Sequence, residues 1–144
     1  MAKLKGKAVV AQSGGPTAVI NASACGVIQT ALKNSGVFTG VYGALNGIVG
    51  VLTEEMFDLG KEDPREIDRL KRSPSAALGS CRHKLKSLDK DRTDYERILE
   101  VFQAHDIRYF FYIGGNDSMD TASKLGRLAR EVDYEMIAVG VPKT

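Results

Sequence analysis

The amino-acid sequence predicts an α/β fold in which helices cover both faces of a parallel sheet. Short apolar runs typical of buried strands alternate along the chain with segments whose apolar residues recur at helical spacing. This alternation favours parallel strands that are joined by helical crossovers. The length of 144 residues and the hydrophobic fraction of 43% suffice for one compact domain.

The first half of the chain is predicted to hold two strands and two main helical segments. Residues 7–12 (KAVVAQ) form the first expected strand, and a glycine-rich turn leads into a helix that ends at residues 34–36. Residues 37–42 are expected to form the second strand, and residues 62–72 a charged, exposed helical stretch. The apolar residues of the first helix are Ile20, Ala24, Val27, Ile28, Ala31 and Leu32.

The second half is predicted to contain two helices and two buried strands. The first helix is expected to begin at Thr93, because Thr93 and Glu96 form a capping-box pair. Residues 108–113 (RYFFYI) are expected to form a strand covered on both faces, and residues 136–141 the last strand. The expected core residues of the helices are Tyr95, Ile98, Leu99 and Phe102, then Met119, Ala122, Leu125 and Leu128. Together these elements predict a three-layer, Rossmann-like parallel sheet.

Composition and charge argue against several classes of function. Lys and Arg total 20 against 18 Asp and Glu, and the net charge of +2 is spread along the chain, so nucleic acid is not an expected partner. No apolar run approaches the roughly 20 residues of a membrane-spanning helix, so no membrane partner is expected. The N-terminus lacks the apolar core of a signal peptide, which favours the cytoplasm. Cys25 and Cys81 match no metal-ligand spacing and are expected to be reduced thiols.

Three glycine-rich or polar loops, at residues 13–18, 43–50 and 114–118, are expected to lie at one edge of the sheet. Each loop follows a predicted strand, and parallel strands place their carboxyl ends at the same edge. Open α/β sheets bind their ligands there. The convergence of these loops is the main functional signal in the sequence, and a small anion suits them as a ligand.

The first and third loops carry groups that can hold a phosphate. The sequence Ser-Gly-Gly-Pro-Thr at residues 13–17 opens a helix, whose N–H groups and positive end favour an anion. A plain tight turn capped by Thr17 explains the same residues equally well. In the third loop, Asn116, Asp117 and Ser118 would suit a phosphate with bound Mg²⁺. The alternative is that Asp117 or Ser118 serves only as the helix N-cap.

Residues 78–84 (LGSCRHK) form a turn of small residues that presents cations. Arg82 could neutralise charge on a transferring phosphoryl group, although a solvated basic turn explains the segment as well. His83 has no identifiable catalytic partner. His105 follows a predicted helix, where a cation is favoured, and needs no catalytic role.

Five segments, in this order, resemble the phosphofructokinase family. They are Ser13-Gly14-Gly15 with Asn21, Gly43 with Gly47 and Gly50, Leu78-Gly79-Ser80-Cys81-Arg82, Ile113-Gly114-Gly115-Asn116-Asp117-Ser118, and Gly140-Val141-Pro142-Lys143-Thr144. The match spans nearly the whole chain. It implies a phosphofructokinase-type N-terminal domain and a glycolytic, reversible transfer of a phosphoryl group to the 1-hydroxyl of fructose 6-phosphate, with Mg²⁺ as the cofactor.

Within that family, the resemblance points to the pyrophosphate-dependent branch. ATP-dependent members typically have glycine at the positions of Asp117 and Lys143. A carboxylate at Asp117 would crowd and repel the α-phosphate of ATP, and the Lys143 ammonium could pair with pyrophosphate. Leu45 is a third indication, because ATP-dependent members often have tyrosine near the adenine at this place.

The resemblance also implies roles for individual residues. They are Gly15, Gly115, Asp117 and Ser118 for the donor phosphates, Arg82 and Lys143 for catalysis, Thr144 for the sugar phosphate, and Asn116 and Asp117 for the metal. Many members of the family have aspartate where Asn116 stands. A neutral amide holds Mg²⁺ less strongly, so Asp117 or water would share the task.

Residues 1–144 are thus expected to form the N-terminal, phosphoryl-donor-binding part of a phosphofructokinase, without the sugar-phosphate domain. The family's catalytic aspartate lies in an Ile-Asp-Asn-Asp segment expected immediately after Thr144, so the chain alone should be inactive. The full-length form should be a homo-oligomer that uses pyrophosphate and fructose 6-phosphate. The alternatives are an ATP-dependent 6-phosphofructokinase that tolerates Asp117 and a non-catalytic phosphate-binding module.

Overall fold

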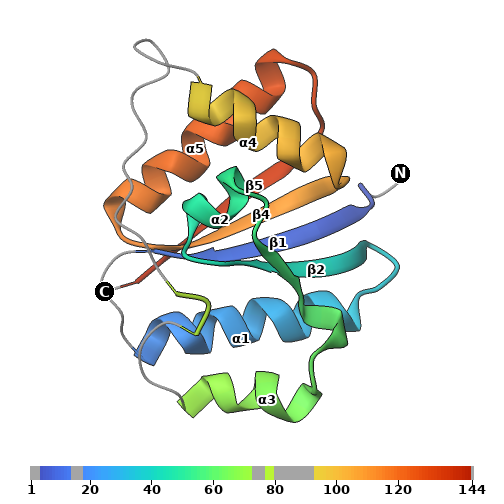
Figure 1. Ribbon diagram of the computed structural model, residues 1–144, viewed down its shortest axis with the longest axis vertical. Helices are drawn as coiled ribbons and strands as arrows, with labels where there is room; N and C mark the ends of the chain where they lie inside the picture. The colour runs from blue at the N-terminus through green and yellow to red at the C-terminus, as the bar shows by residue number, and fades with distance from the viewer. Residues whose placement is uncertain (1–3, 14–17, 73–76, 80–92, 144) are drawn as a thin grey trace.

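The computed structural model describes residues 4–13, 18–72, 77–79 and 93–143. They form a five-stranded sheet, of order β3-β2-β1-β4-β5, with helices on both faces (Figure 1). In chain order the elements are β1 (Gly6–Gln12), α1 (Ala18–Lys33), β2 (Phe38–Ala44), α2 (Ile48–Leu52), β3 (Met56–Asp58), the 3₁₀ turn η1 (Leu59–Lys61), α3 (Pro64–Arg69), the 3₁₀ turn η2 (Leu70–Arg72), α4 (Thr93–Ala104), β4 (Ile107–Gly114), α5 (Asn116–Glu131) and β5 (Ile137–Pro142).

Four of the five strands are parallel, as the sequence predicts. Central β1 pairs with β2 and with β4, so that Val9 lies between Tyr42 and Phe110. β4 in turn pairs with β5. The sequence did not predict β3, which pairs antiparallel with β2, so the sheet is mixed rather than purely parallel. β3 has only three residues, too few to show an alternating pattern.

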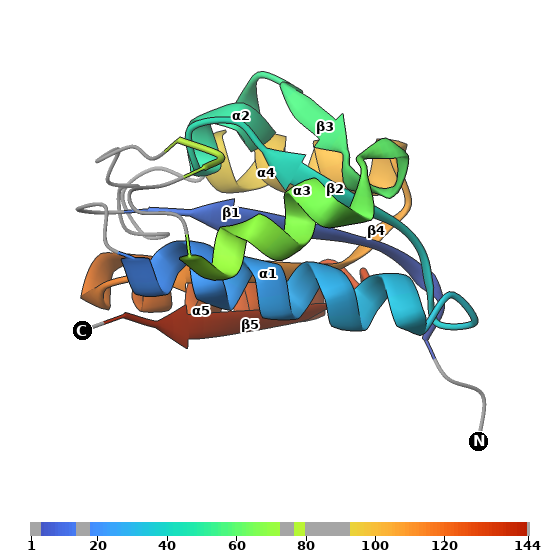
Figure 2. The same ribbon diagram turned by 90° about the horizontal axis from the view of Figure 1, so that it is seen from below.

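Each face of the sheet has its own hydrophobic core. Helices α2, α4 and α5 cover one face, and α1 with α3 covers the other (Figures 1 and 2). Val9 of β1 points into the first core and its neighbour Val10 into the second. β4 likewise contributes Phe110 to the first core and Ile113 to the second. This burial on two sides explains why the predicted strands are continuous apolar runs.

The helical predictions are confirmed with small shifts of their ends. α4 begins at Thr93 as predicted. The stretch predicted at 62–72 begins as a helix only at Pro64, because the Asp63 carboxylate accepts the Arg65 N–H at 2.9 Å and caps α3. The predicted core residues of α4 are all buried: Tyr95, Ile98, Leu99 and Phe102.

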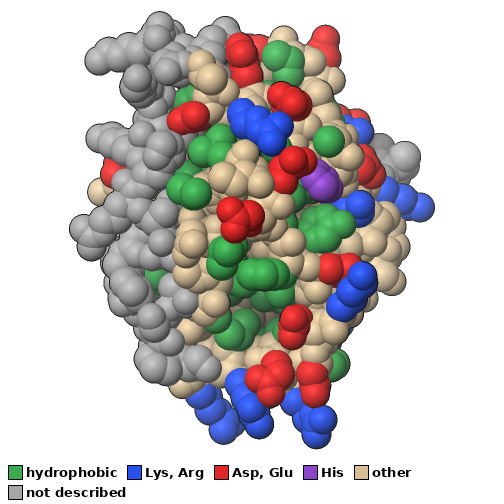
Figure 3. Space-filling model, viewed as in Figure 1, with side chains coloured by type: hydrophobic (Ala, Val, Ile, Leu, Met, Phe, Trp, Pro, Cys, Tyr) green, Lys and Arg blue, Asp and Glu red, His purple; other side chains and the backbone are tan. Residues whose placement is uncertain are grey.

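The surface carries charges of both signs. Acidic and basic side chains lie close together over α3 and α4 on the face shown in Figure 3. Exposed pairs of this kind, such as Arg69 with Glu66 at 3.0 Å, contribute little to stability. No described helix is long and apolar enough to cross a membrane.

Candidate functional site

The carboxyl ends of the four parallel strands lie at one edge of the sheet. β1 and β5 run in the same direction in Figure 2, as their pairing with β4 requires. At this edge the Ser13 N–H donates to the Ile113 carbonyl at 2.9 Å, and the Lys143 N–H donates to the Gly114 carbonyl at 3.0 Å. The predicted convergence of the strand ends is therefore confirmed.

The two glycines after β4 have different surroundings. A Cβ on Gly114 would lie 2.3 Å from Ser118 Oγ and 3.2 Å from Ser13 Cβ, so a side chain there would displace its neighbours. A Cβ on Gly115 would have no atom of the described residues within 4 Å. Gly114 thus permits close packing with Ser13 and Ser118, whereas the described residues leave space around Gly115.

The N-terminus of α5 has no side-chain cap among the described residues. Gly115 is the N-cap residue. The interpretation of Asp117 or Ser118 as the N-cap is therefore wrong. Asn116 and Asp117 are exposed in the first turn, while Ser118 is buried against Gly114. The first N–H groups of a helix lack partners within it, so this end of a 16-residue helix attracts negative charge.

Lys143 lies beside this helix end. β5 pairs with β4 so that Pro142 is opposite Gly114, and the next residue, Lys143, continues the contact through its backbone N–H. The Lys143 side chain is half-buried. The structure thus brings together Lys143 and the Gly115–Asp117 turn, which are 26 residues or more apart in sequence and which the sequence analysis assigned to one site.

The residues predicted for Mg²⁺ fit only part of a metal site. Asn116 and Asp117 offer one amide and one carboxylate on an exposed turn. Among the described residues there is no group of three or more His, Cys, Asp or Glu that could hold a metal ion. Mg²⁺ is commonly held by one or two carboxylates together with substrate phosphates. The side chains at this turn therefore suit an ion that is shared with a bound phosphate.

The sequence model of the phosphofructokinase family matches residues 7–144. The chain belongs to the phosphofructokinase family. This match confirms the resemblance that the five segments indicate, and the observed sheet with helices on both faces agrees with an α/β domain of this family.

Relatives within the phosphofructokinase family are known at high identity. The pyrophosphate–fructose 6-phosphate 1-phosphotransferases of Methylococcus capsulatus and Halomonas elongata are 54% and 52% identical over 137 residues, covering 95% of this chain and 33% of each relative. The crystal structure of pyrophosphate-dependent phosphofructokinase from Marinobacter aquaeolei has 52% identity and a TM-score of 0.89, over 96% of this chain and 33% of that one. This chain therefore spans about a third of the length of these relatives.

Three residues to which the phosphofructokinase resemblance gives roles lie outside the described residues. They are Gly15, Arg82 and Thr144. Their roles stay predictions. So do the donor-binding roles of Gly115, Asp117 and Ser118, the metal-binding roles of Asn116 and Asp117, and the catalytic role of Lys143. Cys81 and His83 lie outside the described residues as well.

Two buried amide side chains near this edge of the sheet have a structural role that sequence reasoning missed. Gln12, the last residue of β1, and Asn21 in α1 are both 0% exposed. Gln12 Nε2 donates to Asn21 Oδ1 at 3.0 Å, and both side chains also accept hydrogen bonds from the backbone of residues 77–78. The available signal was a polar residue, Gln12, at the end of an otherwise apolar buried strand.

The loop after β2 and the short helix α2 owe their arrangement to two glycines, Gly47 and Gly50. Gly47 has a φ of 66°, in the left-handed region that glycine adopts readily. A Cβ on Gly50 would lie 2.2 Å from the Leu45 carbonyl oxygen, so this close approach requires glycine. The family pattern of glycines over 43–50 therefore has a structural explanation. Leu45 itself is half-buried.

The remaining titratable side chains that the sequence analysis considered lie away from this edge. His105 precedes the amino end of β4, and its Nε2 lies 3.1 Å from Glu54 Oε1. The hydrogen bond with His105, together with nearby Arg97, holds the pKa of the Glu54 carboxyl below its usual value. This location agrees with a structural role for His105. Cys25 is a buried free thiol, and burial raises its pKa.

Proposed function

We propose that this chain forms the phosphoryl-donor-binding part of a pyrophosphate-dependent 6-phosphofructokinase. The reaction transfers a phosphoryl group from pyrophosphate to the 1-hydroxyl of fructose 6-phosphate. The observation that carries the proposal is the exposed Asp117 in the first turn of α5, at a helix N-terminus that no described side chain caps, with the backbone of Lys143 beside it. Relatives that are 52–54% identical are named for this activity, which supports the choice of substrates.

The chemistry asked of these residues is mostly positioning and electrostatics. The backbone at Gly115 and the positive end of α5 bind the donor phosphates, and the Lys143 ammonium pairs with their charge. Arg82 bridges donor and acceptor, and Gly15 and Thr144 contact the donor and the sugar phosphate. Asn116 and Asp117 would hold Mg²⁺ together with the donor phosphates, and the ion would supply further neutralisation of phosphate charge.

The setting of this enzyme is part of the same proposal. It works in glycolysis in the cytoplasm, and its full-length form is a homo-oligomer. Residues 1–144 contribute the N-terminal donor-binding part. The groups that bind the sugar phosphate, and the base that takes the proton from the sugar's 1-hydroxyl, lie in the part of the enzyme that corresponds to the remaining length of the relatives.

A donor comparison tests this function. Phosphoryl transfer to fructose 6-phosphate is measured from pyrophosphate and from ATP, each with Mg²⁺, for the complete product of the gene and for residues 1–144 alone. We expect activity with pyrophosphate, and only in the complete product. Activity of residues 1–144 alone would show that the catalytic groups are wrongly placed, and a preference for ATP would reject the donor assignment.

A substitution at Gly115 provides a second test. Gly115→Ala should weaken pyrophosphate binding by about tenfold and lower the free energy of unfolding by only about 1 kcal/mol or less, because alanine is a poorer helix N-cap than glycine. Gly115 has a φ of −87°, which alanine adopts, and the added methyl group would meet no atom of the described residues but would occupy space proposed for the ligand. Isothermal titration calorimetry measures the binding, and thermal unfolding measures the stability.

The matched control is the neighbouring glycine. Gly114→Ala should lower the free energy of unfolding by roughly 1–3 kcal/mol, because its methyl group would overlap Ser118. If Gly115→Ala bound pyrophosphate as tightly as the unmodified protein, the donor phosphates would not lie against this turn.

A further inference from the structure

Helix α5 packs along β5 through two contacts, each of which includes a glycine (Figure 2). Further along α5, a Cβ on Gly126 would lie 3.8 Å from the Ala138 Cβ, which is ordinary van der Waals contact. At the start of α5, Met119 lies on Gly140, where an added Cβ would be 2.5 Å from the Met119 Sδ and 3.6 Å from its Cα. Any side chain at position 140 would therefore have to displace the Met119 thioether.

The backbone of Gly140 does not itself require glycine. Its φ is not in the left-handed region, and Gly140 pairs with Tyr112 inside the parallel ladder between β4 and β5. Glycine weakens a strand, because it has no side chain to pack and loses more conformational freedom on folding than other residues. Glycine inside a strand often marks a close approach by another part of the chain. The contact with Met119 is such an approach, and it explains glycine at this position.

Met119 belongs to the turn to which the proposed function assigns the donor phosphates. Its N–H donates to the Gly115 carbonyl at 3.1 Å, so Met119 closes the first turn of α5. Asp117 lies in this turn, two residues before Met119, and its carbonyl accepts a hydrogen bond from Thr121 Oγ1 at 3.0 Å. The place of Met119 on β5 therefore sets where Gly115 and Asp117 lie relative to that strand.

Strand β5 leads directly to the other residue of the proposed site. Lys143 follows Gly140 by three residues, and its N–H donates to the Gly114 carbonyl at 3.0 Å. This hydrogen bond fixes the strand end at the point where α5 begins, but a helix held only at its first residue could still tilt. The contact of Met119 with Gly140 supplies a second point of attachment, inside the helix. The two attachments together fix the direction of the first turn relative to Lys143.

We propose that Gly140 and Met119 are positioning residues, whose contact holds the first turn of α5 where this turn and Lys143 bind the same pyrophosphate. This inference rests on the proposed function and goes beyond it, because neither residue is assigned a contact with a substrate. Misplacement of a catalytic group by about 1 Å can lower a rate about 100-fold. Pyrophosphate still binds to a displaced turn, whereas its reaction needs both parts in place. Disturbing the contact should therefore lower kcat more than it changes KM.

The test is an exchange of side-chain volume at this contact, in the complete product of the gene. Gly140→Ala crowds Met119, Met119→Ala leaves the contact empty, and the double variant places a methyl group in the space that the thioether leaves. The measurements are kcat and KM with pyrophosphate and fructose 6-phosphate, and thermal unfolding. We expect each single change to lower kcat about tenfold and to change KM less than about threefold. The double variant should lose less than either single variant, because its two changes compensate in volume.

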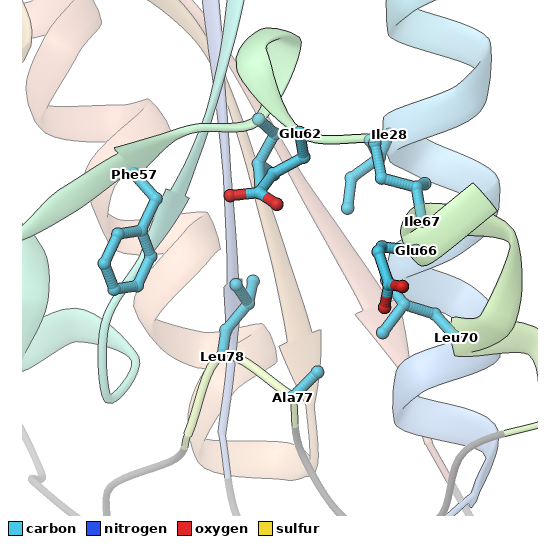
Figure 4. Close-up of a pocket in the computed structure, with 9 residues that line it drawn as sticks. Ile28, Phe57, Glu62, Glu66, Ile67, Leu70, Ala77 and Leu78 are labelled. Atoms are coloured by element: carbon cyan, nitrogen blue, oxygen red, sulfur yellow. The ribbon is translucent and has the colours of Figure 1, made fainter. Parts of the chain in front are cut away.

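Two further variants are the controls. Gly126→Ala adds a methyl group at the other contact between α5 and β5, where it would meet Ala138 at an ordinary distance, and should leave kcat unchanged. Ile67→Ala enlarges a pocket of about 220 Å³ between α1, β3 and α3, which Ile67 lines on the opposite face of the sheet from α5 (Figure 4). It should destabilise the protein and also leave kcat unchanged. The controls separate the placement of the turn from a general loss of stability.

Three results would overturn the inference. Unchanged kcat in both single variants would show that the contact does not place the turn. Losses that multiply to about 100-fold in the double variant would show that the two residues act independently. A loss of kcat in Ile67→Ala as large as in Gly140→Ala would show an effect of stability alone.

The outcome is also decided if Gly140→Ala does not fold. Met119→Ala then tests the contact by itself: a kcat about tenfold lower supports the inference, and a kcat equal to that of the unmodified enzyme overturns it. Failure of the proposed function is distinguishable, because the unmodified enzyme would then transfer no phosphoryl group from pyrophosphate.

Discussion

Replacing Asp117 with glycine is expected to raise the ratio of kcat/KM for ATP to kcat/KM for pyrophosphate by roughly 100-fold. A like charge placed against a ligand costs several kcal/mol, and about 1.4 kcal/mol corresponds to a factor of ten. Asp117 is exposed in the first turn of α5. In the proposed donor site its carboxylate lies against the α-phosphate of ATP. Replacing Asp117 removes the repulsion between its carboxylate and the α-phosphate of ATP. The change also removes the only carboxylate that is proposed to bind the metal.

The matched control is Asp120→Gly. Asp120 is exposed on the same helix one turn further along, and it pairs with Lys124 at 2.6 Å. This change removes the same charge and introduces the same helix-weakening residue, so it should leave the donor ratio as it was. Steady-state rates with both donors measure the effect. An unchanged ratio in Asp117→Gly would mean that other residues choose the donor and would favour an ATP-dependent enzyme that tolerates this aspartate.

Replacing Gly50 with alanine is expected to lower the free energy of unfolding by on the order of 3 kcal/mol. The new Cβ would lie 2.2 Å from the carbonyl oxygen of Leu45 and 2.6 Å from its nitrogen. These are backbone atoms, and their positions are set by hydrogen bonds from Leu45 N–H to the Glu55 carbonyl at 2.9 Å and from Glu55 N–H to the Gly50 carbonyl at 2.7 Å. Neither Gly50 nor Leu45 can move away without breaking the hydrogen bonds that join them to Glu55.

Gly26 in α1 is the control for this second prediction. It is exposed, and a Cβ there would meet no atom of the described residues within 4 Å. Gly26→Ala should therefore stabilise the protein by about 0.5–1 kcal/mol, because alanine favours the helix over glycine. Urea and thermal unfolding of the two variants measure the difference. If both changes had the same effect, the close approach of Gly50 to Leu45 would not contribute to stability.

Much of the fold follows from the local pattern of the sequence. Apolar runs such as residues 108–113 indicate a strand that is buried on both sides, and the spacing of Tyr95, Ile98 and Phe102 indicates a helix with one buried face. Each signal lies within a few consecutive residues, so it can be recognised before the chain is folded. The alternation of these elements then predicts parallel strands, whose common carboxyl edge brings residues 114–118 close to Lys143.

Only the tertiary structure decided which groups meet at that edge. It shows Gly115, rather than Asp117 or Ser118, as the N-cap of α5, and it separates crowded Gly114 from open Gly115. It also adds antiparallel β3, and it joins Gln12 and Asn21 to a segment more than 50 residues away. The reason is physical. The spacing of apolar residues along the chain indicates which side of a helix or strand is buried, whereas these contacts depend on how segments far apart in sequence pack against each other.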